Sequence, residues 1–577
     1  MSRYVASLIA LVVAATVSAA GAQDAVVSWF RAQAIPIQTP EAGHGFDDLQ
    51  PLKKVVGNAR IVALGEATHG TREFFQLKHR LLEFLATEMG FTIFSIEANM
   101  PEAYRLNDYV LTGTGDPKQL LRGMYFWTWD TEEVLDMILW MRRFNESGKG
   151  RVEFTGFDMQ TPTVAVSNVR TFIAAREPSY SPTIAEAAEL SRLASTASGP
   201  AFGVANGTFP LAAAAGKRVR FSGYIKTAGI TRGYAGLWWR VDGPNGTLAF
   251  DNLRDRGATG STDWKLYDLQ LTVPADAKNI NFGVLLTGDG AAWFDDLAVE
   301  LDGVPFADAN LFDFQFESPL PKGFATAGNG YGIGIDAAVF RSGKQSLHMR
   351  SVSASAPEPP RNTAQPAATA WAAIVSHLDQ NRAAYRAAGA VDREIEWTLQ
   401  NARVVLQGLQ MRTNQATRNR SMAENIKWIV DRSPDAKVVL WAHNGHVSAG
   451  GFAFETMGKT LRKIYGDAMV VMGFAFNQGS FQATEVGTLK TFTVPPAPAG
   501  SLDATLAATG LPLLAIDLRT APKTGPVATW LTEPHASRNI GATFSDATAA
   551  SYLLPMKVQE HFDVLLFVEK TTAARKN

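Results

Sequence analysis

Residues 60–85 have the sequence RIVALGEATHGTREFFQLKHRLLEFL. The apolar run 61–64 predicts a buried strand, and the apolar residues of 74–85 recur at helical spacing and predict a helix. The turn between them carries a carboxylate, Glu66, and an imidazole, His69. Ligands of α/β proteins bind beyond the carboxyl ends of the strands, so this turn is the first candidate for a catalytic site.

Strand and helix patterns alternate on both sides of a long central segment. We predict further strands at 91–96, 152–157, 437–441, 468–473, 513–516 and 563–568, and helices at 131–144 and within 367–430. This alternation is typical of a mostly parallel sheet with helical crossovers, so we expect an α/β fold with helices flanking the sheet.

The central segment has a different pattern, with short alternating strands separated by Gly and Pro turns. Strands are predicted at 218–225, 264–273, 280–286, 291–301 and 343–349. The pattern predicts an antiparallel β-sandwich inserted into the α/β domain. The expected organisation is an α/β part at 23–197, the inserted β-sandwich at 198–356, a Pro/Ala-rich linker at 357–366 and a second α/β part at 367–577.

Composition excludes several classes of function. The 577 residues carry a net charge of -1, without the basic surplus that nucleic-acid-binding proteins normally show. The chain has no cysteine, which excludes a cysteine nucleophile, thiolate metal ligands and disulfides. It also lacks G-x-S-x-G, H-E-x-x-H and Walker A motifs. These absences favour direct attack by a water molecule that a histidine or a metal activates.

The N-terminal 22 residues have the pattern of a targeting segment. Arg3 provides a positive start, 6–19 is apolar and rich in small residues, and an A-x-A site at 20–22 precedes Gln23. We expect a cleaved signal peptide and a mature chain that is periplasmic or secreted; the alternative is an uncleaved anchor. No later segment is long and apolar enough to span a bilayer, so we expect no transmembrane segment in the mature chain.

Glu66 and His69 are three residues apart on a turn and can point into one cleft. A histidine needs a partner that fixes its tautomer before it can act as a general base, and Glu66 can provide that partner. We expect His69 to be exposed on this turn. The alternative is a helix N-terminal cap beside a solvated histidine.

A second candidate is the sequence WAHNGH at 441–446, which ends a predicted strand. His443 and His446 can converge on a metal, an oxyanion or a carboxylate; the alternative is backbone capping by His443 and an exposed His446. Two other strands end at acids, Glu97 and Asp158, which are equally explained as caps of the next helices. Because the carboxyl ends of parallel strands share one edge of a sheet, we expect these side chains to meet the first turn there.

Together these residues resemble the erythromycin esterase family. The matching segments, in the order of the family, are GEATHGT at 65–71, FF at 74–75 with Lys78, SIEA at 95–98, YFWTW at 125–129, GFDMQ at 156–160 and WAHNGH at 441–446. The resemblance covers roughly residues 45–180 and 370–570. It implies hydrolysis of a cyclic ester by activated water, with macrolide antibiotics as the substrates of the family.

The resemblance also implies roles for individual residues. His69 would be the general base, Glu66 would hold and tune it, and Glu97 would lie in the active-site cleft. His443 and His446 would polarise the ester carbonyl or stabilise the oxyanion. The residues predicted to bind substrate are Lys78, Arg72, Asp158 and Trp127. We predict no cofactor, with one exception left open: a divalent metal would have Glu66, His69, His443 and His446 as its candidate ligands.

Residues 200–355 have no counterpart in the plain esterases of the family. The segment resembles a carbohydrate-binding β-sandwich, with Trp238-Trp239, Trp264 and AWFDDL at 292–297 and the usual module order rotated. These aromatic residues either fill the core or contact a glycan. Three functions are therefore weighed: an exported esterase that cleaves an ester, including a macrolide lactone; a metal-dependent hydrolase of another ester or amide; and a glycan- or envelope-binding protein with a vestigial active site.

Overall fold

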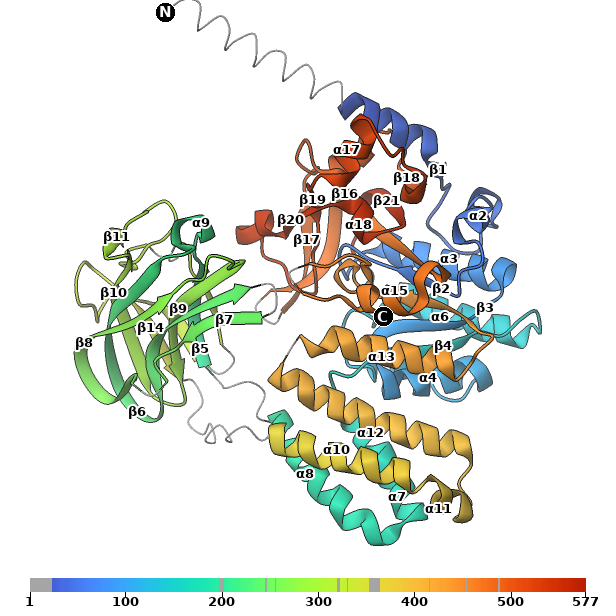
Figure 1. Ribbon diagram of the computed structural model, residues 1–577, viewed down its shortest axis with the longest axis horizontal. Coiled ribbons are helices and arrows are strands. Elements are labelled where there is room, and N and C mark those ends of the chain that lie inside the picture. The colour runs from blue at the N-terminus through green and yellow to red at the C-terminus, as the bar shows by residue number, and fades with distance from the viewer. Residues whose placement is uncertain are drawn as a thin grey trace, which may run out of the picture. The chain divides into compact units, whose positions relative to one another are not determined.

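Figure 1 shows the computed structural model of the chain. The structure describes residues 23–196, 202–243, 246–254, 256–318, 322–328, 331–351, 364–414, 416–452, 454–485 and 488–577. The predicted signal peptide at 1–22 and the larger part of the predicted linker at 357–366 lie outside these residues. Contacts divide the chain into two units, one formed by Met1–Ser181 with Trp371–Asn577 and the other by Pro182–Ala370.

The first unit is built around a nine-stranded sheet with the order β1-β18-β21-β16-β2-β15-β3-β4, and β17 pairs with β16. The strands are β1 (Ile35–Pro36), β2 (Ile61–Leu64), β3 (Phe91–Asn99), β4 (Glu153–Asp158), β15 (Lys437–Trp441), β16 (Met469–Glu485), β17 (Thr488–Val494), β18 (Leu513–Asp517) and β21 (Val564–Thr571). Neighbouring pairs from β21 to β4 are parallel, whereas β1, β17 and β18 pair antiparallel. The predicted α/β fold with a mostly parallel sheet is therefore confirmed.

Both faces of this sheet are covered. All four residues of β2 are buried, and successive side chains of a strand point to opposite faces. The helices of this unit are 23–33, α2 (Leu52–Val56), α3 (Arg72–Met89), α4 (Met100–Thr112), α5 (Pro117–Arg122), α6 (Glu132–Glu146), α7 (Thr163–Arg176), α11 (Arg382–Ala387), α12 (Asp392–Thr413), α13 (Thr417–Asp431), α14 (Asn444–Val447), α15 (Met457–Tyr465), α16 (Leu502–Ala507), α17 (Pro526–Thr532) and α18 (Val558–His561). Two further helices, α8 (Ser181–Thr196) and α10 (Ala364–Gln380), span the boundaries between the two units. A small hairpin is formed by β19 (His535–Arg538) and β20 (Leu553–Met556).

Two segments differ in extent from their predictions. The strand predicted at 468–473 continues as β16 to Glu485, because residues 474–479 pair with β21 and residues 479–485 form an antiparallel hairpin with β17. The helical pattern predicted within 367–430 forms four helices, α10 to α13. In the part of the chain that the structure describes, no helix has the length and apolar character needed to cross a bilayer.

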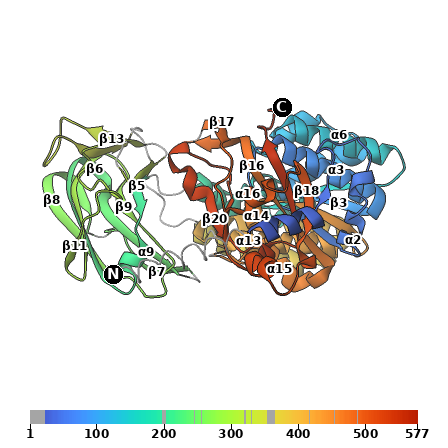
Figure 2. The same ribbon diagram turned by 90° about the horizontal axis from the view of Figure 1, so that it is seen from above.

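The second unit contains a ten-stranded antiparallel sheet, which is green in Figures 1 and 2. Its order is β12-β5-β9-β6-β10-β14-β13, with β11 paired to β10 and both β7 and β8 paired to β6. The elements are β5 (Phe202–Thr208), α9 (Leu211–Ala214), β6 (Arg218–Gly243), β7 (Gly246–Asp251), β8 (Ala258–Thr272), β9 (Asn279–Thr287), β10 (Ala291–Leu301), β11 (Val304–Phe306), β12 (Ala325–Ala327), β13 (Tyr331–Asp336) and β14 (Ser346–Ser351). Its own core includes Trp239, Phe282 and Phe294. The predicted change to antiparallel β structure is confirmed.

Candidate active site

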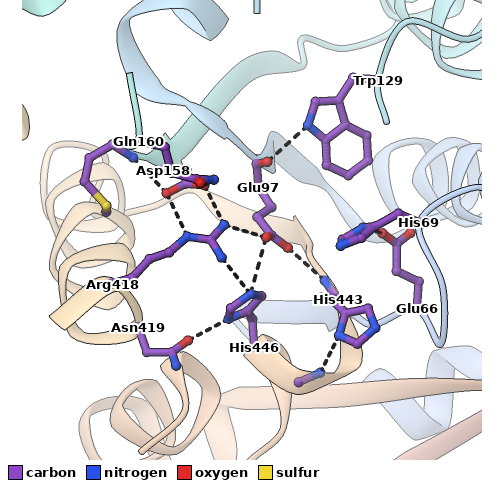
Figure 3. A network of polar contacts seen from close by, with 12 residues as sticks. Glu66, His69, Glu97, Trp129, Asp158, Gln160, Arg418, Asn419, His443 and His446 are labelled. Carbon is purple, nitrogen blue, oxygen red and sulfur yellow. Dashed lines mark hydrogen bonds and ion pairs between the residues drawn. The ribbon is translucent and has the colours of Figure 1, made fainter. Parts of the chain in front are cut away.

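The carboxyl ends of four neighbouring parallel strands lie along one edge of the sheet. These strands are β2, β15, β3 and β4. Glu66 follows β2 and His443 follows β15, while Glu97 and Asp158 lie at the carboxyl ends of β3 and β4. The structure brings these side chains together at this edge, as their positions after parallel strands predicted (Figure 3).

The turn after β2 is fixed by a close approach of the backbone at Gly65. A Cβ atom at this position would lie 2.1 Å from Oδ1 of Asn444. The Asn444 side chain is itself held, because its amide donates to the carbonyl of Phe474 at 2.7 Å and its Oδ1 accepts from the Phe474 N–H at 3.1 Å. The Asn444 N–H also donates to the carbonyl of Glu66 at 2.8 Å. The position requires glycine, and the two candidate turns are joined to each other.

Glu66 is fully buried and accepts from three side chains. Its Oε1 lies 2.6 Å from Nδ1 of His69, and its Oε2 accepts from Nζ of Lys78 at 2.5 Å and from the Trp441 indole at 2.7 Å. Lys78 is 0% exposed, and its ammonium lies 4.3 Å from the centroid of the Trp441 ring. Lys78, which the sequence predicted to bind substrate, is therefore placed as the counter-charge of Glu66.

Opposing effects of burial and charge set the pKa values of this group. Burial disfavours ionisation of Glu66, but Lys78 and His69 lower the pKa of its carboxyl below the ordinary value. Burial disfavours the protonated ring of His69, yet Glu66 and Glu97 raise its pKa above the ordinary value. Burial lowers the pKa of Lys78 to about 8 against the attraction of Glu66. Glu66 is thus a carboxylate at neutral pH and a fixed acceptor for His69.

His69 is only 9% exposed, so the expectation of an exposed turn was wrong. The Trp129 ring packs edge-on against the imidazole with 6.3 Å between centroids. The Ile540 N–H donates to the carbonyl of Ala67 within the same turn at 2.6 Å. Segments that are remote in the sequence cover the turn. The composition of the turn itself therefore does not predict its burial.

Arg418, in the first turn of α13, connects the two strand-end acids (Figure 3). Its guanidinium donates to Oε1 of Glu97 at 2.7 Å and to both carboxylate oxygens of Asp158 at 2.6 and 3.3 Å. The other oxygen of Glu97 accepts the backbone N–H of His443 at 3.0 Å. Burial disfavours ionisation of Glu97, but His446 and Arg418 hold the pKa of its carboxyl far below the usual range. Glu97 is therefore an ionised, firmly held carboxylate.

His443 and His446 use both nitrogens of their rings. Nδ1 of His443 accepts from the N–H of Gly445, so its Nε2–H donates to the carbonyl of Ile540, each at 3.1 Å. Nδ1 of His446 donates to Oδ1 of Asn419 at 2.7 Å, so its Nε2 accepts from the Arg418 guanidinium at 3.0 Å. Burial lowers the pKa of His443 to about 3 and also lowers the pKa of His446. The His443 ring is therefore neutral, and contacts at both nitrogens hold each ring in place.

His69 differs from these two histidines in one respect. Its Nδ1 is engaged by Glu66, and none of the residues that the structure describes forms a hydrogen bond with its Nε2. With the Nδ1 proton held by the carboxylate, the lone pair lies on Nε2. This nitrogen is the ring atom in the cluster that is available to accept a proton.

The chain is similar to known proteins. The sequence model described as "Erythromycin esterase" matches residues 86–213 and 337–571, which is more than half of the chain. The chain belongs to the erythromycin esterase family. The family match is interrupted within the second unit, where the ten-stranded antiparallel sheet lies.

Individual members and relatives match over shorter segments. The chain is 35% identical over 133 residues to "Erythromycin esterase type II" of Escherichia coli, and 34% identical over 135 residues to the putative hydrolase YbfO of Bacillus subtilis. Each match covers 23% of this chain and less than a third of the relative, 31% and 29% respectively. A solved structure of a Bacillus cereus protein covers 96% of this chain and 99% of its own, with 20% identity and a TM-score of 0.61, which shows a shared fold.

Three residues of the cluster were absent from the sequence prediction. Arg418 and Asn419 lie in a helix without a motif. The partners of Arg418, Glu97 and Asp158, are more than two hundred residues away, and Asn419 contacts His446. Trp129 was part of a matching segment but was not chosen; its indole donates to the carbonyl of Glu97 at 3.1 Å. The rule that locates site residues after parallel strands does not apply to a polar residue in the first turn of a helix that no strand precedes.

Two predicted binding residues lie outside this network of contacts. Arg72 forms its ion pairs with Glu133 at 3.8 Å and Glu41 at 4.0 Å. Trp127 is half-buried two residues before Trp129 and makes no described contact with the histidines. Their role in binding stays a prediction from the sequence.

The four candidate metal ligands do not fit a metal ion. Glu66 already accepts from an ammonium, an indole and an imidazole, and both ring nitrogens of His443 and His446 are engaged. Among the described residues, no group of three His, Asp or Glu side chains is arranged to hold a metal. A divalent cation beside Glu66 would also meet the positive charge of Lys78 at close range. No chemical step is therefore derived through a metal.

Proposed function

We propose that this member of the erythromycin esterase family hydrolyses an ester, and that macrolide lactones are the first substrates to test. The observation that carries the proposal is the unengaged Nε2 of His69, whose other nitrogen is held by a buried, ionised Glu66. A carboxylate–imidazole pair of this kind is the usual way to orient a general base. The names of the matching relatives, an erythromycin esterase and a putative hydrolase, support the same reaction class.

In the proposed reaction His69 activates water directly. Glu66 keeps the proton on Nδ1, so Nε2 takes a proton from the water as its oxygen attacks the ester carbonyl. The carbonyl π electrons move to oxygen and form a tetrahedral oxyanion. When the C–O bond to the leaving alkoxide breaks, the imidazolium returns its proton to that alkoxide. The products are a carboxylic acid and an alcohol, which in a lactone are the two ends of one opened ring.

We assign stabilisation of the developing negative charge to Arg418. Four of its five N–H groups donate to described partners, so one is available for an oxyanion. Its guanidinium is held rigidly by Glu97 and Asp158, and preorganised donors are the most effective at this task. Both ring nitrogens of His443 and His446 are engaged, so we assign these histidines to positioning the loop and the guanidinium.

The experiment is mass spectrometry of erythromycin after incubation with the purified protein, with and without a chelator. A gain of one water is expected, and His69→Ala should reduce its rate by about 100- to 10,000-fold, the usual contribution of a general base. His377→Ala is the matched control, because His377 is also paired with a carboxylate, Glu177 at 2.9 Å, but lies outside the cluster. Full activity of His69→Ala would remove the proposed base. Loss of activity with chelator would refute the metal-free reaction.

We also propose export and a sugar-directed role for the second unit. The first 22 residues have the pattern of a signal peptide, so N-terminal sequencing of the processed protein should give a start near Gln23. The antiparallel sheet of the second unit is consistent with an inserted β-sandwich of the carbohydrate-binding type, with Trp264 and Trp293 half-buried. Retention of the protein on insoluble glycans, reduced by Trp293→Ala, would support that role; equal retention of the variant would argue against it.

A further inference from the structure

The first unit contains a cavity that the proposed reaction does not use. Its volume is about 880 Å³, within the range of sites for small molecules. It is lined by residues of α4, α7, α12, α13 and the start of β4. Glu153 opens β4 in the cavity while Asp158 ends the same strand at the catalytic cluster, so the two sites lie at opposite ends of β4.

The same separation holds along α13. Arg418 belongs to its first turn and contacts the catalytic cluster, whereas Trp428, Asp431 and Arg432 line the cavity at its other end. The helix has 15 residues, which corresponds to about 20 Å at 1.5 Å per residue. A ligand in the cavity therefore does not touch the reacting atoms.

Three aromatic rings form one wall of the cavity. The rings of Tyr104 and Trp397 lie 4.3 Å apart between centroids, and Trp397 and Trp428 lie 6.1 Å apart. The Arg432 guanidinium is 5.3 Å from the Tyr104 ring and is held by Glu153 at 3.0 Å. Each of the three rings is half-buried, so part of the wall is available for stacking.

The cavity also carries charged side chains on its rim. Arg105, Arg393 and Asp108 line the same cavity, and among the described residues their side chains form no salt bridge. Positively charged donors and a negatively charged acceptor therefore line the cavity.

We propose that this cavity binds a saccharide. A sugar ring offers C–H faces that pack on aromatic rings and hydroxyls that both donate and accept, which matches the aromatic wall and the mixed polar rim. A ligand with a single strong charge would meet carboxylates and guanidiniums alike, and a purely apolar ligand would leave these groups unpaired. The proposal concerns a binding site apart from the ester-cleaving cluster and does not depend on its activity.

The test is calorimetric titration of the full chain with cellobiose, chitobiose and maltose, and with benzoate and spermine as probes of simple stacking and charge. Binding of at least one disaccharide is expected. Asp108→Asn should weaken it about tenfold, because it removes a charged acceptor from the rim. The variant should keep its melting temperature, since Asp108 is exposed. Trp397→Ala should abolish binding.

Two background variants assign any binding to this cavity. The titrations are repeated in Trp293→Ala, which removes the sugar contact proposed for the second unit, and in His69→Ala of the catalytic cluster, and disaccharide binding should persist in both. Binding that Trp397→Ala or Asp108→Asn leaves intact in the Trp293→Ala background, or no binding in that background, would place the sugar elsewhere and overturn the proposal. A heat of binding with benzoate or spermine but with none of the disaccharides would contradict a saccharide ligand. The absence of binding with every probe would contradict it too.

Discussion

At the scale of single residues, the pairing of Glu66 with His69 predicts a specific pH dependence. A general base works when neutral, so the acid limb of kcat/KM should rise through the pKa of His69, which Glu66 holds above its ordinary value. Glu66→Gln removes that carboxylate, so the pKa of His69 falls and the acid limb moves to lower pH. The rate at neutral pH should also fall by about 100-fold or more, because the tautomer is no longer fixed.

The measurement for Glu66→Gln is the full pH profile of kcat/KM on the substrate established by mass spectrometry. Glu88→Gln is the control, because Glu88 is an exposed carboxylate in the last turn of α3, the helix that follows the Glu66 turn. Its profile should match that of the unaltered protein. An acid limb that stays in place in Glu66→Gln would show that another group titrates.

If Arg418 stabilises the oxyanion, its replacement should lower kcat and leave substrate affinity unchanged. Arg418→Lys keeps the positive charge but cannot make the four contacts that the guanidinium makes, so its position relaxes. We expect kcat to fall about 100-fold with little change in KM, as for loss of an oxyanion donor. Arg420→Lys, an exposed arginine on the same helix, should change neither constant. A rise in KM alone would instead assign Arg418 to substrate binding.

The residues that the sequence revealed share one property. Glu66, His69, Glu97 and Asp158 directly follow or end predicted strands, so the rule for parallel sheets locates them. Arg418 could not be found this way, because it is 321 residues from Glu97 and 260 from Asp158 and no strand precedes it.

At the scale of elements, the joined turns after β2 and β15 predict that Gly65→Ala is destabilising. The new Cβ would overlap Oδ1 of Asn444, which two hydrogen bonds to Phe474 hold in place. We expect the free energy of unfolding to fall by about 1–3 kcal/mol, as for other overpacked sites, with reduced activity. Denaturant unfolding measures the loss. Gly541→Ala is the control, since a Cβ there meets nothing within 4 Å. Equal stability of both variants would contradict the inferred close contact between Gly65 and the Asn444 side chain.

Element boundaries were predictable where hydrophobic periodicity alone determines them. The strand β10 was predicted at 291–301 and spans Ala291–Leu301. The second half of β16 was missed, because residues 474–479 pair with β21 and residues 479–485 pair with β17, and local pattern reveals neither partner. Local pattern also failed to predict the burial of His69, because the segments that bury it are remote in the sequence.

At the scale of the whole molecule, the change in sequence pattern near residue 200 corresponds to a change of core. The α/β unit and the antiparallel unit each have a separate cluster of buried residues. Composition predicted the class of each unit, since alternating strands with Gly and Pro turns differ from strands alternating with helices. The saccharide cavity in the first unit was not predictable, because α4, α7, α12 and α13 meet there only in the folded chain.

Separate cores predict separate unfolding. Trp239 is fully buried among the aromatic rings of the second unit, 5.1 Å from Phe282 between centroids. Trp239→Ala should destabilise that unit by about 3–5 kcal/mol and lower one of two calorimetric transitions. Phe154→Ala, in the core of the first unit, should lower the other one. A single transition, or one that both variants lower together, would show that the two cores unfold as one cooperative structure.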